Sequence, residues 1–458
     1  TAQLEFVRKK LSKIVNGPAF HGARSGLIIR VLDTRTTIYE RNADLPLAPA
    51  SNMKLLTSAV AFCKMGPDYR FETSLLAIAP DGTGALRGNL YLRGGGDPSI
   101  CDPFVRNPAV FLETLAAELA ERGIHEITGD LVADDSLFDR RFLGKGWKAS
   151  YEGEYYSAEH SALSLAGNQL RIIVSPGAHH SAPGVITVQP EATFPKIVNK
   201  TRTTNRNSLR VGRKKNDNLI IVSGGISRWE GPVAFEVNVH NPPLFVASAF
   251  HEALKKKKIR IWGDVRAIGP GESVRGLTKL CSYVSPPVVR LLAHLNKESD
   301  NLFAEHFLKA VAAHAQKEGN LENADHIIRQ FLAGERISSD GLVVADGSGL
   351  SPLNRVTPRL LADLLTAMRR RDDWETFRNT LSVAGKDGTL KYRLRGVTLW
   401  GKTGAIEGVT SLSGYVVTAY GQTLAFSMIT NGENISIGGV RTQEDRVIRT
   451  LAGCGEEF

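Results

Sequence analysis

Three short motifs, far apart in the chain, limit what this sequence can fold into. They are Ser51-Asn52-Met53-Lys54, Ser299-Asp300-Asn301 and Lys402-Thr403-Gly404, in that order. The patterns Ser-x-x-Lys, Ser-x-Asn and Lys-Thr-Gly each occur once. Ser51 and Ser299 are 248 positions apart. If both line one site, a large insertion must leave the catalytic body after the first motif and return before the second.

The first motif has the spacing of a serine nucleophile whose base is an amine. The apolar run Leu55 to Phe62 predicts a helix that begins near Ser51, and a Lys three positions later lies one turn away on the same face. Lys54 can accept the serine proton only if its pKa is lowered, and partial burial together with a second cation, Lys402, would lower it. We therefore expect Ser51 at a helix N-terminus, where the helix dipole favours developing negative charge.

The second motif supplies groups that act on Lys54. We expect Ser299 to relay a proton between Lys54 and the leaving amine, and Asn301 to hold Lys54 and a substrate amide. By itself, Ser-Asp-Asn is more often a turn or a helix cap. The joint occurrence of all three motifs favours the catalytic interpretation.

The third motif is predicted to bind the substrate. We expect Lys402 and Thr403 to receive a substrate carboxylate, and Gly404 to let a strand edge approach a bound peptide closely. The backbone amides of Ser51 and Ala405 are candidates for an oxyanion hole.

The apolar pattern predicts a catalytic body of helices and strands. We expect a sheet whose first and last strands meet, with the terminal helices covering one face. The predicted helices are 4–14, 288–313 with Ser299 and Asn301 inside it, 324–333 and 442–451. The predicted strands are 26–32, 36–39, 398–402, 411–418 and 422–430.

The insertion contains a faint internal repeat. Asn107 to Asp130 resembles Asn241 to Asp264 at an offset of 134 positions, and each copy is predicted to be a helix followed by a strand. Chance sharing of turn residues explains the match about as well as a duplication does. Under either explanation the insertion is structured and is not a linker.

Composition sets the broad class. The chain has 458 residues, of which 42% are apolar and 23% charged, as in ordinary globular proteins. It has no apolar run of the roughly 18 residues that a membrane helix needs. The net charge of +10 is concentrated in Lys200 to Lys215, predicted as a loop or hairpin, and in Lys255 to Arg260. Because neither cluster interleaves aromatic residues, we expect solvated surface and no nucleic-acid partner.

One alternative is a phosphate-binding P-loop. Gly396 to Thr403 fits G-x-x-x-x-G-K-[ST], and Leu342 to Asp346 resembles a strand ending in a magnesium-binding Asp. A P-loop, however, follows a strand and opens a helix, whereas Val397 to Trp400 is itself strand-like. The alternative also leaves Ser51 and Ser299 without a role.

The three motifs together are the signature of penicillin-binding proteins and serine β-lactamases, and longer blocks narrow the resemblance. Over nearly its whole length the chain is similar to the low-molecular-mass class C penicillin-binding proteins, which are D-alanyl-D-alanine carboxypeptidases and endopeptidases of peptidoglycan. The similar blocks are 49–54, 95–98, 285–287, 346–351 and 388–390.

The resemblance implies an α+β fold. A penicillin-recognising, transpeptidase-like domain, with helices flanking an antiparallel sheet, would carry two nested inserted domains. We expect residues 1–62 and 278–458 to form the catalytic domain, 63–90 and 170–277 the inserted domain, and 91–169 a second domain nested in the insertion.

The resemblance also implies a function. It indicates a serine D-Ala-D-Ala carboxypeptidase, with endopeptidase action as a second activity, that forms a Ser51 acyl-enzyme with peptidoglycan stem peptides and is acylated by β-lactams. No metal or organic cofactor is implied. A β-lactamase-like hydrolase or transpeptidase is the alternative within the class, and a weakly active peptidoglycan-binding protein the alternative outside it. Family members act outside the cytoplasmic membrane, so we expect an exported protein of the periplasm or cell envelope, peripherally associated, whose signal peptide is absent from the printed chain.

Three positions depart from the family's pattern around the bound substrate. Ala405 replaces a small hydroxyl residue, Pro352 stands where an Arg is common, and Glu407 replaces a neutral residue. Family members carry an acidic residue shortly before the segment that contains Tyr156, and Glu152 or Tyr151 lies near that position here. A lost cation and a gained carboxylate should weaken binding of a side chain that carries both amine and carboxylate. We expect the altered pocket to prefer a simple amine.

Overall fold

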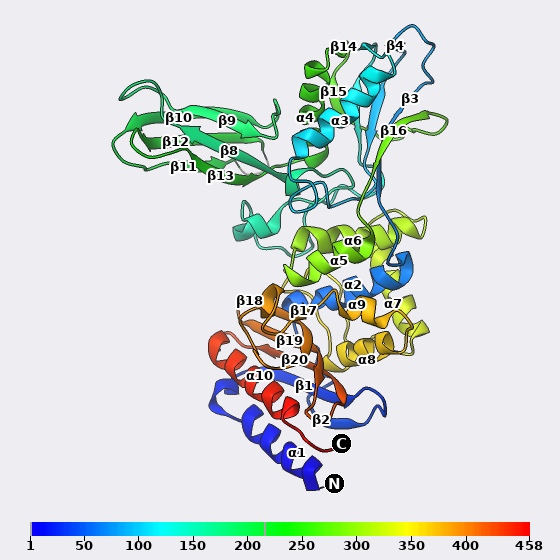
Figure 1. Cartoon of the computed structure of the whole chain (residues 1–458), viewed down its shortest axis with the longest axis vertical. Coiled ribbons are helices and arrows are strands. Elements are labelled where there is room, and N and C mark those ends of the chain that lie inside the picture. Colours follow the sequence, from blue (N-terminus) through cyan, green and yellow to red (C-terminus); the bar gives the residue numbers. More distant parts are fainter. Residues whose placement is uncertain (1, 215–216) are drawn as a thin grey trace. The chain divides into compact units, whose positions relative to one another are not determined.

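The computed structural model describes residues 2–214 and 217–458, and these form two compact units (Figure 1). The first unit contains Thr1–Tyr69, Gly144–Trp147 and Pro287–Phe458, and the second contains Arg70–Leu143 and Lys148–Pro286. The chain first leaves the first unit after Tyr69 and, apart from the short segment Gly144–Trp147, returns to it at Pro287. There the amide of Val288 donates to the carbonyl of Tyr69 at 2.8 Å. The exit and the return therefore lie side by side. The expected division into three domains stays a prediction.

An antiparallel sheet of six strands forms the centre of the first unit. Its order is β17-β18-β19-β20-β1-β2, so the first strand of the chain pairs with the last, as predicted, and Ile28 lies opposite Ser427. The strands are β1 Arg24–Val31, β2 Thr37–Arg41, β17 Ser382–Val383, β18 Leu399–Ile406, β19 Val409–Val417 and β20 Thr423–Asn431.

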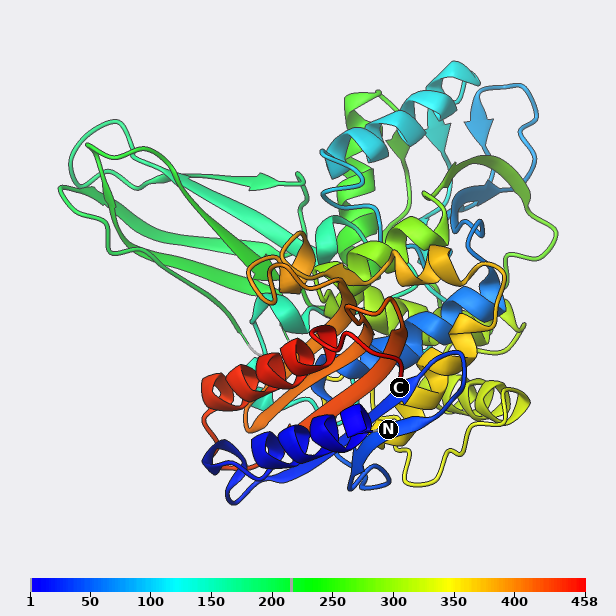
Figure 2. The same ribbon diagram turned by 60° about the horizontal axis from the view of Figure 1, so that its bottom comes forward.

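Helices cover both faces of this sheet. The terminal helices α1 (Ala2–Val15) and α10 (Ile437–Ala452) lie together on one face (Figure 2), where Leu11 and Val447 join a core that includes Leu412 of β19. This confirms the predicted covering by the two terminal helices. The other face packs against α8 (Pro358–Arg369). The remaining helices of this unit lie on the same side; they are α2 Met53–Met65, α5 Val288–Lys297, α6 Asn301–His314, α7 Leu321–Gly334 and α9 Trp374–Arg378.

The helix predicted over 288–313 is two helices, so that prediction was wrong. The chain breaks after α5, where Ser299 has φ +61°. The Asp300 side chain then accepts a hydrogen bond from the amide of Phe303 at 3.1 Å and caps α6. A capping carboxylate competes with continued helix, and the apolar periodicity on either side conceals the break.

In its described residues, the second unit contains a five-stranded sheet, two α-helices and three smaller sheets. The five-stranded sheet has the order β15-β7-β5-β3-β16, with β3 Glu72–Ala77, β5 Leu90–Arg93, β7 Leu131–Asp134, β15 Val265–Ala267 and β16 Thr278–Val284. The helices α3 (Pro108–Glu121) and α4 (Pro242–Lys256) pack on one another. Beside them, a small sheet of order β14-β6-β4 joins Arg260–Ile261, Glu126–Ile127 and Ala85–Leu86.

The other two sheets have three strands each. One has the order β13-β8-β9, with Val233–Asn238, Gln169–Ser175 and Val185–Gln189. The other has the order β10-β12-β11, with Lys196–Thr204, Leu219–Ser227 and Arg210–Arg213. The first basic cluster was predicted as a loop or hairpin, but its strands β10 and β11 pair on opposite sides of β12. Its last residue, Lys215, lies outside the described residues.

The internal repeat has a structural counterpart. Strands β6 and β14 pair in parallel with Glu126 opposite Arg260, and β7 and β15 pair with Leu131 opposite Val265. Both pairs keep the offset of 134 positions found in the sequence. The two helix–strand units thus lie in register beside one another, which favours a duplication over chance.

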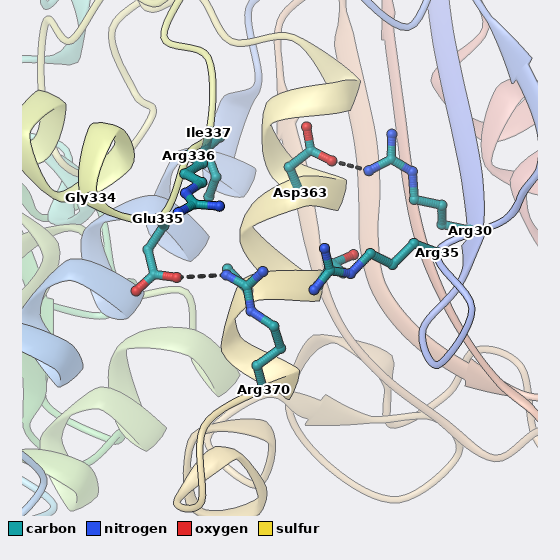
Figure 3. A pocket seen from close by; sticks show the side chains of 10 residues that line it. Arg30, Arg35, Gly334, Glu335, Arg336, Ile337, Asp363 and Arg370 are labelled. Carbon is teal, nitrogen blue, oxygen red and sulfur yellow. Dashed lines mark hydrogen bonds and ion pairs between the residues drawn. The ribbon is translucent and has the colours of Figure 1, made fainter.

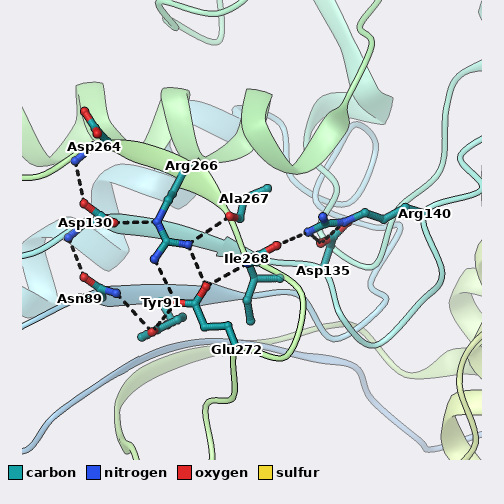
Figure 4. A network of polar contacts seen from close by, with 11 residues as sticks. Asn89, Tyr91, Asp130, Asp135, Arg140, Asp264, Arg266, Ala267, Ile268 and Glu272 are labelled. Carbon is teal, nitrogen blue, oxygen red and sulfur yellow. Dashed lines mark hydrogen bonds and ion pairs between the residues drawn. The ribbon is translucent and has the colours of Figure 1, made fainter.

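A network of polar contacts ties the two repeats together (Figure 4). Arg266, on β15 just after the second repeat, donates to the Asp130 carboxylate of the first at 2.6 Å and to both oxygens of Glu272 at 2.8 and 3.0 Å. The hydroxyl of Tyr91 adds a bond to Glu272 at 2.7 Å. Hydrogen bonding from Arg266 holds the pKa of Glu272 at about 2 and lowers that of Asp130.

We predict that Arg266→Ala lowers the free energy of unfolding by about 1–2 kcal/mol at neutral pH, because it leaves two carboxylates without their shared partner. The lowered pKa of Glu272 stabilises the wild-type fold at pH values above 4.5, the ordinary pKa of this group. The stability difference between wild type and variant should therefore shrink as the pH falls from 4.5 toward 2. Urea unfolding at several pH values measures this. Arg275→Ala, at an exposed position nearby, is the control; an equal loss there would contradict the prediction.

Candidate active site

Ser51 lies in a short 3₁₀ turn, Ala50–Asn52, that leads directly into α2. This agrees with the predicted helix start. The turn is anchored to strand β19: the amide side chain of Asn52 donates to the Ser411 hydroxyl, which donates to the carbonyl of Pro49 at 2.7 Å. The sheet therefore fixes the position of Ser51 through Pro49 and Asn52, which lie on either side of it in the chain.

Lys54 is completely buried and its amine has three hydrogen-bond acceptors. The Nζ atom donates to Ser51 Oγ at 3.0 Å, to Asn301 Oδ1 at 2.6 Å and to the carbonyl of Ser348 at 2.7 Å. An ammonium group has three N–H donors, so this set satisfies all of them. The contact with Asn301 brings the first and second motifs together.

Lys402 lies inside strand β18 and is also completely buried. Its Nζ donates to Ser299 Oγ at 2.9 Å and to the carbonyl of Thr403 at 2.9 Å. The left-handed backbone of Ser299 aims its hydroxyl at this amine, while Asn301, at the start of α6, contacts Lys54. The P-loop alternative was wrong, because Lys402 stands within a strand and opens no helix.

Burial changes the protonation of both amines. It lowers the pKa of Lys54 to about 8, against the opposing effect of nearby Asp346 and Glu305. It lowers the pKa of Lys402 well below its usual range, and repulsion from Lys54 adds to this. We expected a second cation to be a main cause of the Lys54 shift; in the structure burial is that cause.

The carbonyl that accepts from Lys54 is held by a carboxylate that the motifs do not reveal. Glu305 is buried on α6, one turn after Asn301, and its Oε1 accepts from the amides of Gly347 at 3.1 Å and Ser348 at 2.9 Å. Burial and the charge of Asp346 raise the pKa of Glu305 above its usual range. An acidic residue four positions after Asn301 in an apolar helix was the one sequence signal of this role.

Asp346 organises the rest of the same loop. Its carboxylate accepts from the amides of Gly349 at 2.7 Å and Ser351 at 2.6 Å, from Asn354 Nδ2 at 2.6 Å and from Trp147 Nε1 at 2.8 Å. The P-loop alternative treated this residue as a metal ligand. The structure instead makes it the anchor of the loop that carries Ser348.

The predicted substrate-binding residues follow Lys402 on the same strand and turn. Thr403 is half-buried and its hydroxyl donates to that of Thr389 at 2.7 Å. A Cβ on Gly404 would lie 2.3 Å from Ser411 Oγ and 2.9 Å from the amide nitrogen of Ser51. Strand β18 therefore passes directly beside Ser51. Ala405 and Glu407 are exposed near the strand's end.

Tyr156 belongs to the second unit. It lies in the 3₁₀ turn Tyr155–Ser157, and its ring packs edge-on against Tyr151 and Tyr155 with centroid distances of 5.7 and 5.4 Å. Its expected contact with substrate stays a prediction.

An antiparallel sheet flanked by helices, with a serine and two buried lysines beside one strand, defines the class of penicillin-recognising serine hydrolases. Residues 7–452 match the model of the D-Ala-D-Ala carboxypeptidase 3 (S13) family. The chain belongs to that family and is a serine-type peptidase of the D-Ala-D-Ala carboxypeptidase kind.

Individual relatives agree with this assignment. The chain is 32% identical over 451 residues to a D-alanyl-D-alanine carboxypeptidase of Actinomadura sp. strain R39, covering 94% of this chain and 82% of the relative. It superposes on the crystal structure of penicillin-binding protein 4 (dacB) from Haemophilus influenzae with a TM-score of 0.81, at 25% identity, covering 96% and 99% of the two chains. A second structure of that protein, complexed with a β-lactam, gives 0.76 at 23% identity, with 97% and 99% covered.

We predict that Gly404→Ala slows acylation of Ser51 by at least about tenfold, because the new methyl group must displace β18 from Ser51 and Ser411. Stopped-flow or gel measurement of the rate with a fluorescent penicillin tests this. Gly212→Ala is the matched control: that glycine is also on a strand, but a Cβ there meets nothing within 4 Å. Unchanged acylation in Gly404→Ala would contradict the prediction.

Proposed function

We propose that the chain removes the terminal D-alanine from peptidoglycan stem peptides that end in D-Ala-D-Ala, through an acyl-enzyme on Ser51. The observation that carries this proposal is the 3.0 Å contact between Ser51 Oγ and the buried amine of Lys54. An amine with a pKa near 8 is neutral in a useful fraction of molecules at neutral pH, so it can act as the base.

The reaction divides into two steps. Neutral Lys54 takes the hydroxyl proton as Ser51 Oγ bonds to the carbonyl carbon of the penultimate D-alanine. The C–N bond then breaks, the leaving amine takes a proton, and D-alanine departs. In the second step water attacks the ester, its proton passes to the same base, and Ser51 is restored.

Ser299 and Lys402 are placed for the leaving group. Ser299 Oγ already bonds to Lys402, so we propose that this pair, with Lys54, returns the proton to the departing amine. A substrate carboxylate near Lys402 and Thr403 offsets the cost of charging a buried amine, so substrate binding favours the protonated form of Lys402. The amides of Ser51 and Ala405 remain our candidates for the oxyanion hole.

The contacts of the buried carboxylates near Lys54 support a peptidase over a β-lactamase, so we expect β-lactams to be released slowly. The two buried carboxylates nearest Lys54, Glu305 and Asp346, are engaged by backbone amides. Neither is free to activate a deacylating water as a dedicated carboxylate base would. A merely peptidoglycan-binding role is disfavoured because all three motifs converge. Endopeptidase cleavage of D-Ala-linked cross-bridges is a second activity of the same site.

The side-chain pocket is altered in this proposal. Pro352 provides no cation, and Arg355 in the same turn donates to the carbonyls of Pro352 and Asn354 at 2.6 and 2.7 Å. Glu407 adds a carboxylate near the end of β18. These features support a preference for a lysine side chain over diaminopimelate at the third position of the stem peptide.

The site of action follows from this substrate. None of the described helices is long and apolar enough to cross a membrane. We propose an extracytoplasmic location, in the periplasm or at the envelope, where stem peptides are accessible.

We predict that the wild-type chain is labelled covalently by a fluorescent penicillin and that Ser51→Ala is not. Mass spectrometry should place the adduct on Ser51, and release of D-alanine from matched lysine and diaminopimelate peptides should also stop in the variant. Thermal melting checks that the variant is folded. Labelling that persists in a folded Ser51→Ala protein would end the proposal, and a clear preference for diaminopimelate would end the pocket assignment.

We predict that the acylation rate rises with pH, with a midpoint near pH 8, and levels off about one pH unit higher, because only neutral Lys54 can take the serine proton. Glu305→Gln should move the midpoint to lower pH, since the Glu305 carboxylate raises the pKa of Lys54. The amide oxygen of Gln can still accept from Gly347 and Ser348. Acylation rates across pH 6–10 measure the shift, and a midpoint that stays in place or moves upward would refute the assignment.

A further inference from the structure

The first unit has a polar pocket lined by arginines, and none of the motif residues lines it (Figure 3). It has a volume of about 470 Å³. We call it the arginine pocket; its lining residues are Arg30, Arg35, Gly334, Glu335, Arg336, Ile337, Asp363, Thr366, Ala367 and Arg370. They come from β1, the turn after it, the end of α7 and helix α8.

The charges of this pocket do not balance. Arg30 pairs with Asp363, and Arg370 pairs with Glu335 at 2.8 Å. Arg35 and Arg336 have no ion-pair or hydrogen-bond partner for their guanidinium groups within residues 2–214 and 217–458. Four arginines against two carboxylates leave an excess of two positive charges in one cavity.

The arrangement of the guanidinium groups adds to this. Figure 3 shows the side chains of Arg35 and Arg370 pointing toward one another in front of α8, with Arg336 on the side of α7. Like charges that converge on a cavity repel one another, and an anion between them removes the repulsion. Ile337 and Thr366, which are both buried, line the same pocket.

The two unpaired arginines also occupy unusual backbone positions. Arg35, in the turn between β1 and β2, and Arg336, just after α7, both have φ +58°. The amide of Ile337 bonds to the carbonyl of Leu332 at 2.8 Å, which makes Arg336 the left-handed residue of a Schellman cap. Glycine or asparagine is the usual choice at such positions. Here the chain has a long cation at both, and both face one pocket.

We propose that the arginine pocket binds a phosphate group of a phosphate-bearing ligand. Guanidinium groups match phosphate oxygens in pairs and stay charged at every physiological pH. The excess of two charges matches a phosphate monoester, and the volume leaves room for a small attached group. The ligand is a soluble phosphate ester or the headgroup of an anionic lipid, which share this chemistry.

The backbone makes a clean test possible. Because glycine suits φ +58° better than arginine does, Arg35→Gly with Arg336→Gly removes both unpaired cations without straining the fold. Lys258→Gly is the matched control, since Lys258 is an exposed cation with φ +59° in the other unit. Thermal melting should show each variant at least as stable as the wild type, and penicillin labelling should be unchanged.

Isothermal calorimetry with inorganic phosphate and glycerol 3-phosphate at low ionic strength measures the binding. We expect saturable binding by the wild type, at least tenfold weaker binding by the double variant, and no change in Lys258→Gly. Acetate should bind at least tenfold more weakly than phosphate. Absence of saturable phosphate binding, equal binding of acetate, or an unchanged double variant would each overturn the proposal.

Co-sedimentation with vesicles distinguishes the two sources of phosphate. If vesicles of phosphatidylglycerol, but not of phosphatidylcholine, retain the wild type and lose the double variant, the ligand is a lipid headgroup. If calorimetry shows phosphate binding and the wild type and double variant sediment alike, the ligand is a soluble phosphate ester. Both results support the pocket and differ only in what occupies it.

Discussion

The burial of the Lys54 amine is the constraint on which the site depends. Its three acceptors come from Ser51, Asn301 and Ser348, which lie on three distant stretches of the chain. An amine removed from water must keep its donors satisfied or lose its charge. Only a fold that brings these three stretches together can satisfy all three donors. The central sheet, α2 and α6 together position the acceptors of the Lys54 amine.

A second layer of buried charge supports this arrangement. Glu305 and Asp346 fix the loop that offers the Ser348 carbonyl, and both also favour the charged form of Lys54. Desolvation and these carboxylates act in opposite directions, and their balance leaves the pKa of Lys54 near 8. The same helix, α6, carries Asn301 and Glu305 one turn apart. One element therefore sets both the position of the amine and its proton affinity.

Much of this could be predicted from sequence, and the remainder depended on tertiary contacts. The ordered motifs predicted Ser51, Lys54, Asn301 and Lys402, and the apolar pattern predicted the meeting of β1 with β20. The break at Ser299 was missed because apolar spacing continues across it and only the Asp300 cap interrupts the helix. Glu305 was missed because its partners are backbone amides forty residues later, which no side-chain pattern records.

The chain uses its two kinds of cation for different physical tasks. Lysine amines change their pKa readily on burial, so Lys54 beside Ser51 and Lys402 beside Ser299 can exchange protons. Guanidinium groups keep their charge, so the four in the arginine pocket can hold an anion but cannot serve as bases. Arginines in place of Lys54 and Lys402 would preserve charge and abolish proton transfer. Within one unit of the fold, lysines therefore serve proton transfer and arginines serve the binding of an anion.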